Sequence, residues 1–208
     1  MLKNPLKISR SVAEKTIKSM NNDIWKKSPY QKLGHMSTDE RGRNGEEFCV
    51  ALLESIGFGV FWEGDSNISS KDADTYDFVI TEMPDGKATQ KKVEVKSSME
   101  GRNLDSWQHD SIKEDGWDYL MFYDRCVGED GNFYITIHKH SEFPKRGEKH
   151  SILQRVKTPC KDGFKFDMMK TKDVRKGYTR MVGEKMAIYV DKNTTHKNIS
   201  SFINDRLS

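Results

Sequence analysis

The sequence is poor in the residues that mark several common protein classes. Of its 208 residues only three are cysteine, Cys49, Cys126 and Cys160, and no CxxC pair occurs. An odd, scattered set predicts neither a disulfide framework nor a thiolate zinc site. No run approaches the roughly 20 apolar residues of a membrane-spanning helix, and the N-terminus lacks the apolar core of a signal peptide. We therefore expect a cytoplasmic, intracellular protein with reduced thiols and no membrane partner.

Patterns typical of nucleotide and acyl-transfer chemistry are also absent from the sequence. There is no P-loop, no G-x-G-x-x-G turn and no G-x-S-x-G nucleophile, so we expect no nucleotide cofactor. Charged residues make up 32% of the chain, yet aromatic residues reach 10%, which argues against a disordered protein. The length favours one domain with a substantial core.

The net charge of +3 is modest, but its distribution along the chain is uneven. Between residues 145 and 185 basic side chains outnumber acidic ones. A basic block of this kind is typical of a polyanion-binding face, and the plain alternative is a solvated charged surface. The basic residues of this block are Lys145, Arg146, Lys149, Arg155, Lys157, Lys161, Lys165, Lys170, Lys172, Arg175, Lys176, Arg180 and Lys185.

Hydrophobic periodicity predicts alternating helices and strands. Ser37 to Glu40 resembles a helix start, and Gly57 is a natural stop, so a helix is expected between them, after a loop over 25–36. Further helices are expected at 8–25, 104–113 and 199–207, and strands at 58–62, 76–81, 91–97, 117–123, 132–138 and 186–190.

This order predicts an α/β fold with a central mixed sheet flanked by α-helices. We divide the chain into an N-terminal helical segment at 1–36, a core at 37–140 and a basic, polyanion-binding extension at 141–208. The three parts are expected to form a single domain, with the extension packed on the core.

Two charged residues interrupt an otherwise apolar strand at Val93-Glu94-Val95-Lys96. Side chains alternate along a strand, so Glu94 and Lys96 share one face while the valines face the core. A solvent-exposed face would explain the pair without further function. Buried charge without a partner is costly, however, so a charged pair on a core strand calls for a reason.

Asp77 opens the preceding apolar strand, which a hairpin turn places beside residues 92–96. Two carboxylates and a lysine can then converge. Carboxylate oxygens suit Mg²⁺, which keeps several water ligands for a substrate phosphate, with Mn²⁺ as a substitute. A bound metal lowers the pKa of its water, and a nearby ammonium can hold that water, which makes a set able to hydrolyse a phosphodiester.

The order of these elements resembles the PD-(D/E)xK nuclease superfamily, which includes most type II restriction endonucleases. Tyr76-Asp77 stands where the family has Pro-Asp, and Glu94-Val95-Lys96 matches its E-x-K element. Glu46 lies where the family places a helical glutamate, whereas neighbouring Glu47 is interpreted as a surface residue. Gln108 follows where many members have a glutamine. The resemblance covers roughly residues 40 to 140 and implies the restriction-endonuclease-like core.

The resemblance also implies roles for these residues. Asp77 and Glu94 would bind the metal, with the Val95 carbonyl as a third ligand. Lys96 would position the attacking water and stabilise charge on the phosphate. Glu46 would bind a second metal directly or through water. Gln108 would act as a supporting or DNA-backbone-positioning residue.

Three functions remain open at this point. The first is a type II restriction endonuclease that cuts double-stranded DNA as a twofold homodimer. The second is a structure-selective nuclease for branched DNA, and the third is a DNA-binding protein of the same fold that does not cut. The candidates for phosphate or base contacts are Lys145, Arg146, Arg155, Lys157, Arg175, Lys176 and Arg180.

Three histidines form a competing signal. His138 and His140 would share one face of a strand, with His150 nearby in sequence. A metal site or a histidine-based nuclease would need further Asn or Cys partners, which we do not find. We interpret them as exposed histidines at a strand end near DNA. Trp107 and Trp117 stand beside apolar neighbours and are expected in the core.

Overall fold

We describe the fold from a computed structural model of the chain. The structure describes residues 6–7, 9, 25–62, 76–82, 88–100, 106–142, 153–158, 161–169 and 186–208, with the backbone alone at 153–158 and 161–169. The helix predicted at 8–25 lies almost wholly outside these residues. The loop predicted at 25–36 contains a short 3₁₀ helix, η2 (Gln31–His35). Within the described residues no helix combines the length and apolarity needed to cross a membrane.

The long helix α2 (Thr38–Ser55) confirms the helix predicted from Ser37. The Ser37 hydroxyl accepts the N–H of Glu40 at 3.2 Å, and the Glu40 carboxylate accepts the N–H of Ser37 at 2.8 Å. This capping box satisfies N–H groups that a helix start leaves free. Past the helix, Gly57 has a φ of 102°, a value that glycine adopts without strain. Both ends of α2 are therefore encoded locally.

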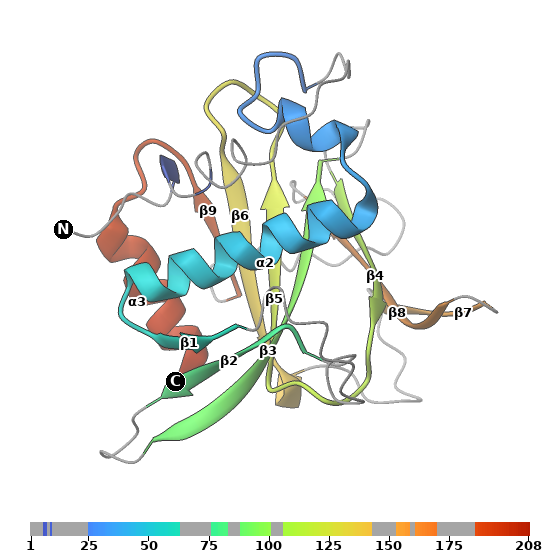
Figure 1. Cartoon of the computed structure of the whole chain (residues 1–208), viewed down its shortest axis with the longest axis vertical. Helices are drawn as coiled ribbons and strands as arrows, with labels where there is room; N and C mark the ends of the chain where they lie inside the picture. The colour runs from blue at the N-terminus through green and yellow to red at the C-terminus, as the bar shows by residue number, and fades with distance from the viewer. Residues whose placement is uncertain are drawn as a thin grey trace.

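A six-stranded mixed sheet forms the centre of the molecule (Figure 1). Its strand order is β1-β2-β3-β5-β6-β9, and the β3–β5 pair is parallel whereas the others are antiparallel. The predicted mixed sheet is confirmed, as are its strands. Their bounds are β1 (Gly59–Phe61), β2 (Phe78–Glu82), β3 (Thr89–Met99), β5 (Tyr119–Arg125), β6 (Phe133–Lys139) and β9 (Ala187–Val190).

The two faces of this sheet are covered differently. Helices α2 and α3 (His196–Leu207) pack on one face, where their apolar side chains join those of the strands in the main core. The other face carries a second, aromatic core that includes Trp107, Trp117, Phe122 and Tyr134. Trp107 and Trp117 are thus core residues, as predicted. Figure 1 shows α2 lying across the strands of the sheet.

The helix predicted at 104–113 is wrong. Residues Ser106–Ile112 form strand β4, which belongs to a three-stranded sheet of order β4-β8-β7. Trp107 and His109 alternate inward and are buried, with a register shift before Ile112. Tertiary pairing with β8 decides the conformation here, because the apolar residues of β4, Trp107 and Ile112, lie five apart and fit neither a helical nor a strand period.

The partner strands of β4 were not predicted. Strands β7 (Leu153–Thr158) and β8 (Lys161–Met169) form an antiparallel hairpin in which Thr158 pairs with Lys161. Their alternation is interrupted by Arg, Lys and Asp, so the sequence gives a weak strand signal. The hairpin lies in the basic block, at the side of the molecule away from α3 (Figure 1).

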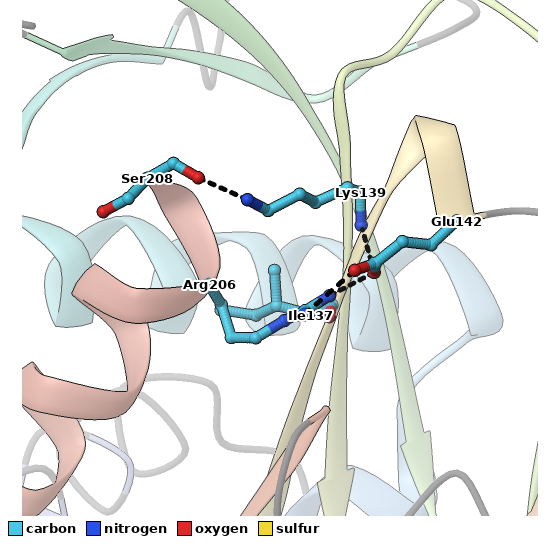
Figure 2. A network of polar contacts seen from close by, with 5 residues as sticks. All are labelled: Ile137, Lys139, Glu142, Arg206 and Ser208. Carbon is cyan, nitrogen blue, oxygen red and sulfur yellow. Dashed lines mark hydrogen bonds and ion pairs between the residues drawn. The ribbon is translucent and has the colours of Figure 1, made fainter.

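The C-terminal helix is fastened to the end of β6 by a set of polar contacts that we call the C-terminal network: Lys139, Glu142, Arg206 and Ser208 (Figure 2). Arg206 donates to the Ile137 carbonyl at 3.0 Å and pairs with the carboxylate of Glu142. Lys139 donates to the main-chain oxygen of Ser208. Residues 186–208 thereby complete the sheet and its helical cover.

Candidate active site

The site lies where β2 separates from β3. Pairing of the two strands ends at Phe78 and Val93. Just before this point Asp77 donates its N–H to the Val93 carbonyl at 2.9 Å, and its carboxylate accepts the Val95 N–H at 2.6 Å. Asp77 therefore continues the hydrogen bonding of β2, because its side chain accepts the next N–H on the edge of β3 that has no strand partner. The carboxylate is held in place by the main chain.

Glu94 and Lys96 lie on the face of β3 that turns away from the helices. Val93 and Val95 belong to the main core, so the predicted alternation holds. The Lys96 ammonium donates to the Glu94 carboxylate. The Glu94 side chain is only 6% exposed whereas that of Lys96 is 25% exposed, so the pair links the interior to a solvent-accessible surface.

Helix α2 brings Glu46 to the same place through an unusually close approach to β3. A Cβ added at Gly45 would overlap the Cβ and Oγ of Ser97. The Ser97 hydroxyl also donates to the Arg41 carbonyl at 3.1 Å. Glycine at this position lets the helix backbone lie against the strand. The side chain of Trp62 also lies near the Glu46 carboxylate and opposes the rise of its pKa.

Glu46, Asp77 and Glu94 form a group that we call the carboxylate cluster. Burial and the charge of Asp77 raise the pKa of Glu46 to about 7. The same two causes raise the pKa of Glu94 to about 7 against the opposing charge of Lys96. Burial also raises the pKa of Asp77, although the Val95 N–H and Lys96 oppose it. The negative charges of the carboxylate cluster are thus only partly compensated by nearby cationic side chains.

A cavity of about 670 Å³ opens onto this cluster. It runs along the first half of α2 and the second half of β3 and reaches β4 and the end of β5. It brings Glu46, Asp77, Val95 and Lys96 to one surface, and Glu94 joins them through its bond to Lys96. The lining residues are Thr38, Asp39, Arg41, Gly42, Glu46, Asp77, Val95, Lys96, Ser97, Ser98, Met99, His109 and Arg125.

The oxygen donors of the site are of the chemical type that binds a hard divalent cation, but they are not arranged as a coordination sphere. Among the described residues no three His, Cys, Asp or Glu side chains are arranged as a ready ligand set. One reason is that the Glu94 carboxylate is turned to Lys96. Burial raises the pKa of all three carboxylates, and the charge of Asp77 adds to the rise for Glu46 and Glu94, so a bound cation would stabilise the set. Glu46, Asp77 and Glu94, with the Val95 carbonyl, are the groups that could hold it.

Gln108 and the basic candidates are only partly placed. Gln108 lies on strand β4 rather than on a helix, and its side chain is not described. Arg155 and Lys157 lie on β7, of which the backbone alone is described. The remaining candidates, Lys145, Arg146, Arg175, Lys176 and Arg180, lie outside the described residues.

The interpretation of the histidines needs correction. His138 is 1% exposed and belongs to the interior of β6, so it is not an exposed strand-end residue. His140 begins the 3₁₀ helix η4 (His140–Glu142), and its Nε2 lies 2.9 Å from the Glu114 carbonyl. The aromatic neighbours of His138 favour burial, and the strand ends before His140, so the two rings do not share a strand face.

Sequence reasoning missed several residues of the site. Ser97 and Trp62 position Glu46, and His109 and Arg125 line the cavity. Trp62 and Arg125 carry no local signal, because only the packing of distant elements brings them here. Gly45 followed by Glu46 in mid-helix was a usable signal, since a glycine inside a long helix often marks a close approach.

Comparisons with known proteins add little to this description. No family model matches the chain, and no curated protein matches it. Among solved structures, the bacterial homing endonuclease I-Ssp6803I is similar, with 15% sequence identity and a TM-score of 0.43 over 67% of this chain and 83% of that chain. A likeness at this level leaves the function to be argued from the site itself.

Proposed function

We propose that this protein is a Mg²⁺-dependent endonuclease that hydrolyses phosphodiester bonds of double-stranded DNA. The observation that carries the proposal is the convergence of Glu46, Asp77 and Lys96 at one cavity, with Glu94 paired to Lys96 beside it and with raised carboxylate pKa values. Few structural roles require three carboxylates with raised pKa values beside a lysine, one of them buried and the other two half-buried. The resemblance of Asp77 and Glu94-Val95-Lys96 to the PD-(D/E)xK pattern supports the same interpretation.

The proposed roles follow from how each side chain is held. Asp77, fixed by the Val95 N–H, and the two glutamates would hold the metal ion. When bound, Mg²⁺ supplies charge neutralisation at the phosphate and acidifies water. Lys96 is partly exposed and paired with Glu94, so its ammonium can orient the attacking water and stabilise negative charge that develops on the phosphate. Arg41 lines the cavity and can contact a neighbouring phosphate.

We further propose that the enzyme is a sequence-specific type II restriction endonuclease acting as a homodimer. The β4-β8-β7 sheet supports this finer proposal, because it extends from the cavity wall at β4 into the basic block that carries Arg155 and Lys157 on β7. A surface of this kind next to the site offers room for base contacts as well as phosphate contacts. Palindromic sites are matched by twofold symmetry.

A digestion experiment tests both levels of the proposal. Purified protein is incubated with plasmid DNA, phage DNA and a synthetic four-way junction, with Mg²⁺ or with a chelator. Discrete plasmid fragments that require Mg²⁺ are expected. Cleavage of the junction alone would replace the restriction proposal with the structure-selective one. Retardation of DNA in a gel without cleavage under any condition would overturn the nuclease proposal.

A pair of variants on one strand ties the activity to the site. Lys96→Ala removes the ammonium and is expected to abolish cutting while DNA binding survives. Lys92→Ala is the matched control, because Lys92 lies on the same face of β3 but is exposed and contacts Tyr76 instead. Wild-type cleavage rates in Lys96→Ala would contradict the assignment of the site.

A further inference from the structure

A buried histidine and a buried aspartate face each other where β4 meets the main sheet. The Nε2 atom of His109 on β4 is 2.8 Å from Oδ1 of Asp124 on β5, and each side chain is 1% exposed. Among the described residues, neither Nε2 of His109 nor the carboxylate of Asp124 makes a hydrogen bond of good geometry, to each other or to a third group. The two groups therefore depend on each other for compensation of charge.

Stability alone does not account for this pair. Its surroundings are aromatic, with Trp107, Phe122 and Tyr134 in the same core. Taking two ions out of water costs several kcal/mol, and apolar side chains of similar size commonly serve a core as well or better. An imidazole and a carboxylate that share a proton in a dry site are, in contrast, a common way to hold a proton ready.

The pair is also placed next to the proposed catalytic groups. The His109 ring stacks on Phe122 with centroids 4.3 Å apart and planes inclined by 24°. Phe122 is the register partner of Lys96 in the parallel β3–β5 pair, and adjacent strands are about 4.8 Å apart. His109 and Lys96 both line the cavity. The imidazole thus lies over Phe122, the residue beside Lys96 on the neighbouring strand, and borders the same cavity as Lys96.

We propose that His109, oriented by Asp124, is a further catalytic residue that donates a proton to the leaving sugar oxygen during phosphodiester hydrolysis. The inference rests on the proposed nuclease function. As the bond from water oxygen to phosphorus forms, the bond from phosphorus to the leaving oxygen breaks, and its electron pair takes the proton of the imidazolium. The attacking water loses its proton to solvent, and His109 regains one from solvent after the product leaves.

The other cationic groups of the lining are less suited to this task. Arg41 and Arg125 cannot give up a proton near neutral pH, since a guanidinium stays charged. The Lys96 ammonium is engaged with Glu94. Histidine is the side chain whose ordinary pKa lies closest to neutrality, and His109 is the one histidine among the described residues that line the cavity.

A leaving-group substitution tests the proposal. The bond that the wild-type enzyme cuts is first mapped on plasmid DNA with Mg²⁺. Two duplexes are then made, one natural and one with sulfur in place of the leaving oxygen, because a thiolate leaves without being protonated. His109→Gln is expected to slow cleavage of the natural bond about 100-fold, within the usual range for general acid catalysis. Cleavage of the sulfur-containing bond should change by less than about threefold, because it needs no acid.

The ratio of the two rates keeps the test independent of folding, because misfolded protein lowers both rates equally. His138→Gln is the matched control: its ring also contacts Phe122, 5.6 Å away, but it does not line the cavity, so its ratio should match that of the wild type. His109→Asn should behave as His109→Gln does. An unchanged ratio in His109→Gln while the wild type cuts DNA would overturn this proposal alone, and failure of the wild type to cut either duplex would overturn the nuclease proposal with it.

Discussion

The carboxylate cluster and the C-terminal network use similar side chains to opposite effect. In the network, burial alone would raise the pKa of Glu142, but its bonds from Arg206 and the Lys139 N–H outweigh burial and lower that pKa. In the cluster, burial and repulsion raise the pKa of Glu46 and Glu94 to about 7. One set of charges holds the chain together, whereas the other is kept unsatisfied at the edge of a cavity. Carboxylates that lack a cationic partner in the folded protein can instead bind a positively charged ligand.

The largest expected effect is a loss of cleavage activity when the carboxylate cluster is changed. Asp77→Asn keeps an oxygen for the Val95 N–H but removes a charge, and cleavage should fall about 1,000-fold, equivalent to ~4 kcal/mol of transition-state stabilisation. Asp118→Asn is the matched control. The Asp118 carboxylate accepts another N–H of β3, that of Lys92, at 2.8 Å, but Asp118 does not line the cavity. Plasmid cleavage rates measure both, and equal losses would contradict a special role for Asp77.

The second effect concerns the spacing of α2 and β3. Gly45→Ala forces the new methyl group against Ser97, which should cost about 1–3 kcal/mol of stability. Displacement of Glu46 by about 1 Å should also slow cleavage up to about 100-fold. Gly42→Ala is the control, because a Cβ there meets nothing within 4 Å and should stabilise the helix by about 1 kcal/mol. Chemical unfolding should show a lower free energy of unfolding for Gly45→Ala and a higher one for Gly42→Ala.

The third effect tests whether the cluster destabilises the free protein. Because the pKa of Glu46 is raised from 4.5 to about 7 by folding, the folded protein favours its protonated form. Its ionised form therefore destabilises the fold above about pH 7, and stability is regained as the pH falls from about 7 toward 4.5. Without metal, Glu46→Gln should be more stable than the wild type at pH 8, by on the order of 2 kcal/mol. At pH 5 the difference should largely vanish.

Unfolding curves at the two pH values, with and without Mg²⁺, measure this difference. Mg²⁺ should stabilise the wild type more than Glu46→Gln, because the variant replaces a charged carboxylate with a neutral amide. Glu54→Gln, on the exposed side of the same helix, should show neither effect. A Glu46→Gln protein that is less stable than the wild type at pH 8 would contradict the view that the cluster is strained.

The smallest effect belongs to the C-terminal network. Arg206→Ala removes the bonds to Ile137 and Glu142 and should lower the free energy of unfolding by about 1–2 kcal/mol, without a change in cleavage. Since the pKa of Glu142 is lowered by folding, its contribution is present at neutral pH and is lost as the pH falls below its ordinary value of 4.5. Lys197→Ala, exposed on α3, is the control. Thermal melts at pH 7 and pH 4 test the pH dependence.

The regions that the sequence predicts well are those whose signals are local. The capping box at Ser37 and Glu40 and the glycine stop at Gly57 fix α2 within a few residues of the expected helix. The alternation through Val93 and Val95 correctly predicts that Glu94 and Lys96 share one face of their strand. Local hydrogen bonding and a two-residue period act over distances that a sequence window covers.

The regions that it predicts poorly depend on distant partners. Strand β4 is a strand because β8 lies beside it, although the paired residues Trp107 and Met168 are 61 positions apart in the chain. In sequence Asp124 resembles a surface residue, yet it is buried against His109 from that same strand β4. Trp62 reaches Glu46 only because β1 ends near α2. No local pattern encodes such encounters, since tertiary contacts override propensity.

The contact of Gly45 with Ser97 has a consequence for how the molecule moves. With no Cβ between the two backbones and with the Ser97 hydroxyl bound to the Arg41 carbonyl, the helix cannot slide along the strand without breaking both contacts. Local opening of α2 around residues 41–46 should therefore be cooperative with opening of β3 around 95–97. Amide hydrogens of the two segments should exchange with solvent as one unit, although they are far apart in the chain. Fluctuations that loosen the rest of the fold would leave the separation between Glu46 and Lys96 unchanged.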